Sequence, residues 1–112
     1  MDCLFCKIVN GEIPSTKIYE DRWVYAFEDI APQAPFHAII IPKEHIASAA
    51  EIDEENSHLM AAVFEAVAKI AKEYNLEKGF RVVNNCGEDG GQTVSHIHFH
   101  LLARRNLAWP PG

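Results

Sequence analysis

Three histidines alternate with apolar residues in the segment HIHFHLL, at residues 96–102 of the 112-residue chain. Alternate side chains of a β-strand share one face, so His96, His98 and His100 are expected to point the same way, with the apolar residues turned into the core. A neutral imidazole is a good nucleophile near pH 7 and also leaves readily. The pattern therefore indicates nucleophilic catalysis as one function of this segment.

Two other interpretations of the three histidines remain open. They could simply form the solvent face of a strand, although histidine has no special preference for strands. They could also bind a metal ion. Alternate residues stand about 6.5 Å apart along a strand, whereas Zn–N bonds measure about 2.0–2.1 Å. Three rings therefore cannot easily share one ion, but two rings and an outside ligand can.

A glycine-rich segment, NCGEDGGQT at residues 85–93, comes just before the histidines. Glycines let backbone N–H groups approach an anion closely, and Thr93 adds a hydroxyl group. Preorganised donors of this kind stabilise the charge that develops on phosphoryl oxygens. The segment could also be a plain polar turn between two strands, but its position beside the histidines favours a phosphate-binding loop.

The histidine segment resembles the His-φ-His-φ-His-φ-φ signature of the histidine triad (HIT) superfamily, where φ is an apolar residue. The sequence WPPG at residues 109–112 resembles the ending of its Hint branch, the histidine triad nucleotide-binding proteins. The segments DIAPQAP at residues 29–35 and IPKEH at residues 41–45 also match the family in order and spacing. The resemblance covers nearly the whole chain.

The resemblance implies a covalent mechanism. His98 would attack the α-phosphorus of an adenylate and form a nucleotidyl-histidine, which water then hydrolyses. His100 would contact the phosphate, and His96 would support the other two. Members of this branch hydrolyse purine nucleoside phosphoramidates, releasing AMP and an amine. Two alternatives are a dinucleoside polyphosphate hydrolase with the same nucleophile, and a zinc-stabilised nucleotide-binding module without turnover.

The resemblance also assigns contacts with the nucleotide. The ribose hydroxyls would bind the carboxylate of Asp29, which could instead cap a strand end through an Asx turn. The expected lining of the base slot is Phe5, Ile8, Phe27 and Ile30, which could equally be ordinary core. The residues expected to meet the phosphate are Asn85, Gly91 and Thr93, together with His98 and His100, and Gln92 is also expected to bind the nucleotide.

Cys3 and Cys6 have the spacing of half a zinc knuckle, although one such pair is a weak motif. Some bacterial members of the superfamily resemble this chain here and complete a Cys2His2 site with two histidines, which match His45 and His96. Such a zinc ion would be structural, because four protein ligands leave no open position, and catalysis would need no cofactor. The cysteines could instead be small hydrophobic residues on a short helix.

The remaining sequence predicts the elements that position these residues. A short helix is expected over residues 4–9, and strands over residues 17–20, 23–27, 37–41, 80–83 and 94–102. A long helix is expected after an N-cap at Asp53. Its apolar face would consist of Met60, Val63, Phe64, Val67, Ile70, Ala71 and Tyr74. This is an α+β, HIT-like fold in a single domain (residues 1–112), with a five-stranded antiparallel sheet, one long helix and a short N-terminal helix.

The composition limits the classes of partner. The chain has 16 acidic residues against 10 Lys and Arg, and a formal net charge of −6. This balance disfavours binding to DNA or RNA and leaves a small nucleotide as the expected partner. No secretory signal or membrane span is expected, and three cysteines do not suggest a disulfide framework, so we expect a cytoplasmic protein.

A domain of this size gains buried surface by association. The resemblance implies a homodimer in which central strands and long helices join, with Trp109 reaching towards the partner's site. We assign no role to His37 and His58, which are expected at the surface or at the edge of the core.

Overall fold

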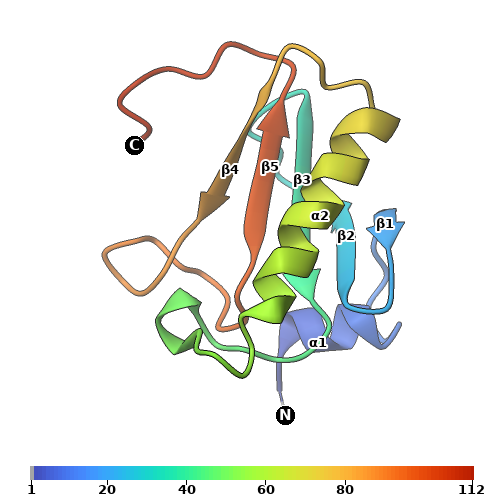
Figure 1. The fold of residues 1–112 in the computed structure, drawn as a ribbon, viewed down its shortest axis with the longest axis vertical. Helices are drawn as coiled ribbons and strands as arrows, with labels where there is room; N and C mark the ends of the chain where they lie inside the picture. Colours follow the sequence, from blue (N-terminus) through green and yellow to red (C-terminus); the bar gives the residue numbers. More distant parts are fainter. Residues whose placement is uncertain (1) are drawn as a thin grey trace.

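The computed structural model describes residues 2–112. A five-stranded antiparallel sheet with the strand order β1-β2-β3-β5-β4 forms its centre (Figure 1). The elements in chain order are α1 (Leu4–Val9), β1 (Lys17–Glu20), β2 (Val24–Glu28), β3 (Phe36–Pro42), the 3-10 helix η1 (Ala49–Glu51), α2 (His58–Glu73), β4 (Phe80–Asn84) and β5 (Phe99–Ala103). The predicted α+β fold, with one long and one short helix, is confirmed.

A helix packs against each face of the sheet, and in Figure 1 α2 lies across the sheet while the short α1 lies near its lower end. On one face α2 packs over the centre of the sheet, where Val63 and Ile70 meet Ile40 and other buried residues. On the other face α1 contributes Phe5 and Ile8 to a smaller cluster with Phe27, Ile39 and Ile41. Every residue of β3 is buried, because this strand lies between the two clusters.

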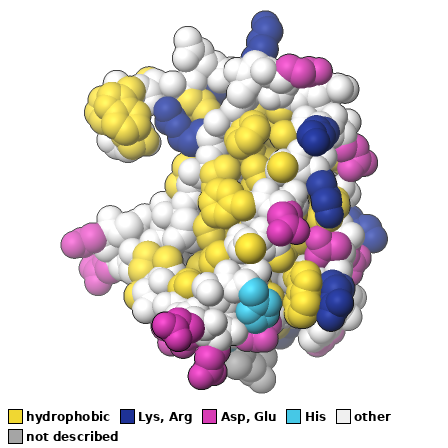
Figure 2. Space-filling model, in the orientation of Figure 1, with side chains coloured by type: hydrophobic (Ala, Val, Ile, Leu, Met, Phe, Trp, Pro, Cys, Tyr) yellow, Lys and Arg dark blue, Asp and Glu magenta, His cyan; other side chains and the backbone are white. Residues whose placement is uncertain are grey.

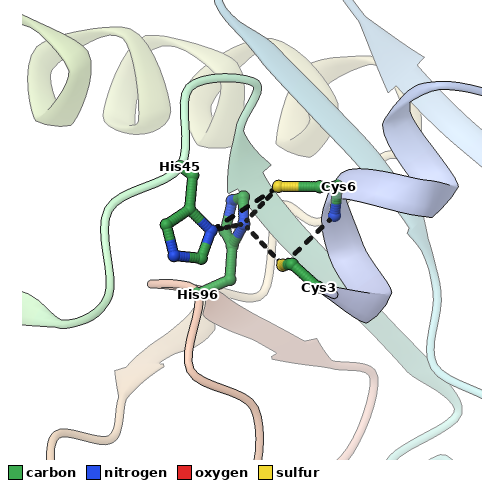
Figure 3. Close-up of side chains that lie close together, drawn as sticks. All are labelled: Cys3, Cys6, His45 and His96. Carbon is green, nitrogen blue, oxygen red and sulfur yellow. Dashed lines mark hydrogen bonds between the residues drawn. The ribbon is translucent and has the colours of Figure 1, made fainter. Parts of the chain in front are cut away.

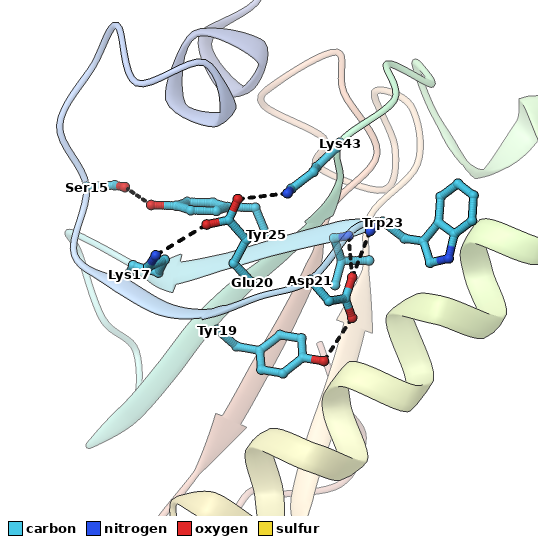
Figure 4. A network of polar contacts seen from close by, with 9 residues as sticks. Ser15, Lys17, Tyr19, Glu20, Asp21, Trp23, Tyr25 and Lys43 are labelled. Atoms are coloured by element: carbon cyan, nitrogen blue, oxygen red, sulfur yellow. Dashed lines mark hydrogen bonds and ion pairs between the residues drawn. The ribbon is translucent and has the colours of Figure 1, made fainter.

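The β1–β2 hairpin is fixed by polar contacts at its turn (Figure 4). The carboxylate of Asp21 accepts hydrogen bonds from the backbone N–H groups of Trp23 and Val24, at 2.8 and 2.9 Å. Glu20 forms an ion pair with Lys43 at 2.7 Å, which ties β1 to the segment after β3. These contacts explain why the hairpin forms where the sequence predicts it.

The long helix begins later than the sequence predicts. The carboxylate of Asp53 accepts hydrogen bonds from the N–H groups of Glu55 and Asn56, at 2.9 and 3.1 Å. Asp53 therefore caps a separate turn, and α2 starts at His58. The predicted N-cap is thus wrong, because the acidic residues stabilise that turn and not the first turn of the helix.

The last strand is shorter than the predicted range 94–102, so His96 and His98 precede β5. Residues 94–98 bond to the segment that follows β3, as in the hydrogen bond from the N–H of Ile97 to the carbonyl of Ile46 at 2.6 Å. The predicted alternation still holds, because Ile97 and Leu101 are fully buried on the α2 side.

One face of the molecule carries exposed hydrophobic side chains (Figure 2). Phe64 of α2 is 52% exposed, Phe80 of β4 is 43% exposed, and Trp109 of the C-terminal segment is 82% exposed. Phe64, which is predicted on the apolar face of the long helix, packs in a T-shaped arrangement with the Phe99 ring but leaves half of its surface exposed. Among residues 2–112, no helix is long and apolar enough to cross a membrane.

Candidate active site

His98 lies just before β5 and is only 4% exposed. Its Nδ1 atom is 2.8 Å from the backbone carbonyl oxygen of His96. Because a carbonyl oxygen only accepts hydrogen bonds, Nδ1 carries the proton and the lone pair of the neutral ring is on Nε2. The side-chain amide of Asn84 donates to the carbonyl of His98 at 2.9 Å and fixes the backbone there. The geometry thus gives His98 the tautomer that a nucleophilic Nε2 needs.

His100 contacts His37, a residue to which the sequence analysis assigns no role. His37 is buried in β3, and its Nε2 is 2.8 Å from Nδ1 of His100. The backbone N–H of Gln33 donates to Nδ1 of His37 at 3.0 Å. Neutral His37 therefore carries its proton on Nε2 and donates it to His100. It follows that neutral His100 carries its own proton on Nε2, where it can donate to a ligand.

The carboxylate of Asp29 completes a group with His37 and His100, and the three ligand atoms all lie within 4.8 Å of one another. Oδ2 of Asp29 is 3.4 Å from Nε2 of His37. Such a group could hold a metal ion only if each imidazole offered a lone pair. The proton on Nε2 of His37 excludes this, so we interpret the group as a hydrogen-bond network.

Both histidines of this network titrate below the usual range. Burial lowers the pKa of His100, the neighbouring His98 and His37 lower it further, and Asp29 opposes the shift. Burial also lowers the pKa of His37, again against the effect of Asp29. Since an unperturbed histidine has a pKa of about 6.5, both rings are neutral at pH 7, as the hydrogen bonds require.

An open cavity of about 330 Å³ lies beside Asp29. Its lining comes from α1, from the segment before β1 and from the end of β2, and consists of Ile8, Pro14, Ser15, Thr16, Phe27, Glu28, Asp29 and Ile30. Four residues predicted to hold the nucleoside, Ile8, Phe27, Asp29 and Ile30, therefore lie together. Phe5 is not part of this lining, and its ring instead packs edge-on against His98, with 5.1 Å between the ring centres.

Asp29 forms the Asx turn that the sequence leaves open, and its contact with a ribose stays a prediction. Its Oδ1 accepts a hydrogen bond from the N–H of Ala31 at 2.7 Å, which is the Asx turn. A carboxylate has about four lone-pair sites, so the turn leaves capacity for the hydroxyls of a ribose. The turn also fixes the direction in which the carboxylate points.

The glycine-rich loop is held by the side chain of Gln92. Nε2 of Gln92 donates to the carbonyls of Ala47 and Val94, at 2.7 and 2.9 Å, and its Oε1 accepts from the N–H of Gly87 at 3.0 Å. The amide therefore joins three segments of the chain. This gives Gln92 a structural role in addition to the predicted contact with the nucleotide, which stays a prediction.

Two positions in this loop require glycine for steric reasons. A Cβ at Gly90 would run into the backbone carbonyl of Cys86. Gly91 has a φ of +78°, in the left-handed region that favours glycine. Asn85 is half-buried at the start of the loop and Thr93 is exposed at its end. Their contacts with a phosphate, like that of Gly91, stay a prediction.

A second cluster brings Cys3 and Cys6 together with His45 and His96 (Figure 3). Nδ1 of His96 is 3.4 Å from Sγ of Cys3 and 3.6 Å from Sγ of Cys6. Nδ1 of His45 is 3.5 Å from Sγ of Cys6 and 3.2 Å from Nδ1 of His96. Tetrahedral zinc with bonds of about 2.0–2.3 Å separates its ligand atoms by about 3.3–3.8 Å. The measured distances closely match this spacing.

The chemistry of the four side chains also fits a metal ion. Burial and the neighbouring Cys3 raise the pKa of the Cys6 thiol to about 11, so Cys6 keeps its proton at neutral pH unless a cation stabilises the thiolate. Nε2 of His96 is 2.9 Å from the carbonyl oxygen of Pro42 and carries the ring proton. That hydrogen bond leaves Nδ1 of His96 as the ligand atom. The cluster could therefore bind a metal ion.

The comparisons with known proteins agree with this geometry. Residues 10–107 match the model of the HIT domain family. The chain belongs to the HIT family. A HIT family hydrolase from Legionella pneumophila has the same fold, with a TM-score of 0.96 and 49% identity over 99% of this chain and 100% of that one.

Two relatives of the HIT chain carry more specific names. A 14 kDa zinc-binding protein from Zea mays is 46% identical over 97% of this chain and 87% of its own length. Adenylylsulfatase HINT1 from Arabidopsis thaliana is 40% identical over 97% of this chain and 76% of its own length.

The sequence does not predict a role for two residues of the HIT site, His37 and Asn84. His37 lies in a strand whose residues are all buried, so no alternation marks it as special. Strand register could have found it, because Ile39 pairs with His100 and residues two positions apart share a face. Asn84 lies beside the predicted Asn85, and the sequence offers no signal for its bond to the backbone of His98.

Proposed function

We propose that this HIT protein hydrolyses purine nucleoside phosphoramidates and releases AMP through a covalent intermediate on His98. The observation that carries the proposal is the hydrogen bond from Nδ1 of His98 to the carbonyl of His96, which leaves the lone pair on Nε2. The hydrolase name of a relative at 49% identity supports the general reaction class.

The proposed reaction has two steps. In the first, Nε2 of His98 attacks the α-phosphorus, an N–P bond forms, and the bond from phosphorus to the leaving amine breaks as the amine takes a proton from water. In the second, water attacks phosphorus, the bond to His98 breaks, AMP leaves and a proton returns to solvent. The Nε2 proton of His100 stabilises charge on the phosphoryl oxygens in both steps.

The same residues would bind the nucleoside. The carboxylate of Asp29 accepts hydrogen bonds from the ribose hydroxyls, and the base enters the cavity formed by Ile8, Phe27 and Ile30. Asn85, Gly91 and Thr93 supply further donors to the phosphate. The purine edge faces an open cavity, which suits a site that accepts several purines.

A second candidate substrate is adenylyl sulfate. The relative from Arabidopsis thaliana is named an adenylylsulfatase, and it is 40% identical to this chain. Sulfate would leave in place of the amine, with no change in the nucleophile. Dinucleoside polyphosphates present a third leaving group to the same histidine, so all three substrates belong in one assay.

We also propose that zinc binds at Cys3, Cys6, His45 and His96 and stabilises the fold. A closed set of four protein ligands leaves no coordination position for substrate. The spacing of the ligand atoms and the name of the relative from Zea mays support this assignment. When bound, the ion would hold the two thiols as thiolates.

We propose a homodimer as the working form. The edge strand β4 begins with the exposed Phe80, which lies on the α2 side of the sheet because its partner Ala103 belongs to the core under α2, and Phe64 of α2 is exposed as well. Hydrophobic side chains are exposed on the face of the molecule that Figure 2 shows. A second copy placed edge to edge would pair the free backbone groups of β4 and cover both phenylalanines. The exposed Trp109 would then lie near the partner's site.

The first test measures AMP release from adenosine 5′-phosphoramidate, adenylyl sulfate and diadenosine triphosphate. His98→Ala is expected to lower kcat by about 10³-fold or more, because the nucleophile is gone, and to retain AMP binding in calorimetry. His58→Ala, at an exposed position of α2, is the matched control. A His98→Ala variant with full turnover would overturn the proposal. AMP binding by the native chain without turnover of any substrate would favour a nucleotide-binding module.

A further inference from the structure

We propose that the cluster of Cys3, Cys6, His45 and His96 positions the nucleophile His98, in addition to stabilising the fold. Metal binding at the cluster fixes the backbone carbonyl of His96, and that carbonyl holds His98 in its reactive tautomer. The inference rests on the proposed function, because it concerns the reactivity of His98 in that reaction.

The first argument concerns the contacts that the polar atoms of His96 make. His96 is fully buried. Its Nδ1 faces both thiols and His45, its Nε2 donates to the carbonyl of Pro42, and its own carbonyl accepts from Nδ1 of His98. The ring and the carbonyl belong to one residue, so a ligand bond that fixes the ring also restricts the carbonyl.

The second argument concerns α1. Cys3 and Cys6 flank Phe5 in the sequence, and the ring of Phe5 packs edge-on against His96 and His98, with ring centres 5.9 and 5.1 Å apart. Ligand bonds from both cysteines would therefore also hold the ring of Phe5 against the ring of His98. The cluster would thus constrain His98 through two contacts, the carbonyl of His96 and the ring of Phe5.

The third argument is that His98 lies outside the regular sheet. Residues 94–98 have no strand ladder, and β5 begins only at Phe99. The hydrogen bond from Ile97 to Ile46 ties these residues to the segment that carries His45. The cluster adds a bond between the same two segments, at the point where the ladder is missing.

The expected effect is on kcat and not on binding. Outer contacts that orient a functional histidine typically change activity by about 10–100-fold when removed. Loss of the cluster should therefore lower kcat within that range and leave the affinity for AMP within about threefold, since the cavity beside Asp29 is separate. His96 and His45 act here as positioning residues, because neither touches the substrate.

The experiment compares full-length native protein, His45→Ala and His45→Cys, each loaded with zinc. His45→Ala removes one ligand, whereas His45→Cys restores a four-ligand zinc set. For each protein, kcat, KM and AMP affinity are measured, and the tautomer of His98 is followed by nitrogen-15 NMR of its ring. Circular dichroism and thermal melting confirm folding, and His45→Asn replaces His45→Ala if the alanine variant does not fold.

We expect His45→Ala to lose about 10–100-fold in kcat, to keep its AMP affinity and to show a mixture of His98 tautomers, with both properties rescued in His45→Cys. Unchanged kcat and an unchanged His98 spectrum in folded His45→Ala would overturn the inference and leave the cluster a purely structural role. If the native protein has no turnover, the proposed function fails, but the NMR comparison still decides whether the cluster orients His98.

Discussion

His98 and His100 stand two positions apart with opposite hydrogen-bonding character. Nδ1 of His98 donates to the carbonyl of His96, so its Nε2 offers a lone pair. Nδ1 of His100 accepts from His37, so its Nε2 offers a proton. A ring nitrogen with a lone pair and a ring nitrogen with a proton therefore lie close together, as the proposed nucleophile and its proposed phosphate contact require. The arrangement needs no charged histidine, because burial keeps His37 and His100 neutral at pH 7.

His37 should therefore control the tautomer of His100. His37→Gln is expected to lower kcat by about 10–100-fold, because it breaks the chain of hydrogen bonds that places a proton on Nε2 of His100. The affinity for AMP should change by less than about threefold. Steady-state kinetics and calorimetry measure both, with His58→Gln as the exposed control. A variant that loses AMP affinity and keeps kcat would contradict this role.

At the scale of elements, the irregular segments around the sheet hold the site together. Residues 94–98 lie outside β5, and the loop at residues 85–93 has no ladder of its own. Gln92 joins this loop to Ala47 and Val94 by two hydrogen bonds, and it accepts a third from Gly87 within the loop. Its side chain thus replaces the backbone pairing that a regular strand would supply.

Gln92→Leu should loosen the loop without unfolding the domain. The substitution keeps the size of the side chain and removes all three hydrogen bonds, which leaves the N–H of Gly87 and two carbonyls unpaired. We expect faster hydrogen exchange at Gly87 and a kcat lower by about tenfold. Asn56→Leu is the control, because its side-chain amide bonds only to Glu51 and Asp53 in its own loop, away from the candidate site. Unchanged exchange at Gly87 would show that the loop is held by other contacts.

The sequence predicts the regular elements better than the irregular ones. The alternation of residues 96–102 correctly separates the histidines from Ile97 and Leu101, because strand geometry persists beyond the hydrogen-bonded ladder. His37 is missed because it lies within a strand buried on both faces. The bonds of Gln92 depend on Ala47, 45 positions away, and no local pattern encodes such a contact. The four ligands of the metal cluster could be assigned only by resemblance, since a single Cys pair is a weak motif.

At the scale of the whole molecule, the sheet ends in two edge strands, β1 and β4. The β1 edge is tied to the segment after β3 by the ion pair of Glu20 with Lys43. Phe80 of the β4 edge lies on the α2 side of the sheet, and both Phe80 and Phe64 of α2 are exposed. Natural proteins rarely leave an apolar edge strand free, because it invites pairing with another chain.

Phe80→Glu should therefore convert the proposed dimer into a monomer. A carboxylate at this position would be desolvated against the same residue of a second copy, and two like charges would meet across the interface. Analytical ultracentrifugation at micromolar concentration measures the change in mass. Trp23→Glu, at an exposed aromatic residue in the hairpin, should leave the dimer intact. A native chain that sediments as a monomer would contradict the proposed assembly.

Metal binding at the proposed Cys3, Cys6, His45 and His96 site would have a topological consequence for the chain. Cys3 and His96 are 93 positions apart, so a bond through one ion would close a loop that contains α1, α2 and the first four strands. Such a cross-link removes conformations from the unfolded ensemble, and the entropy removed grows with the length of the loop. A single ion would thus restrict the conformations of nearly the entire unfolded polypeptide. The free energy of unfolding would then depend on the concentration of available metal as well as on the packing of the core.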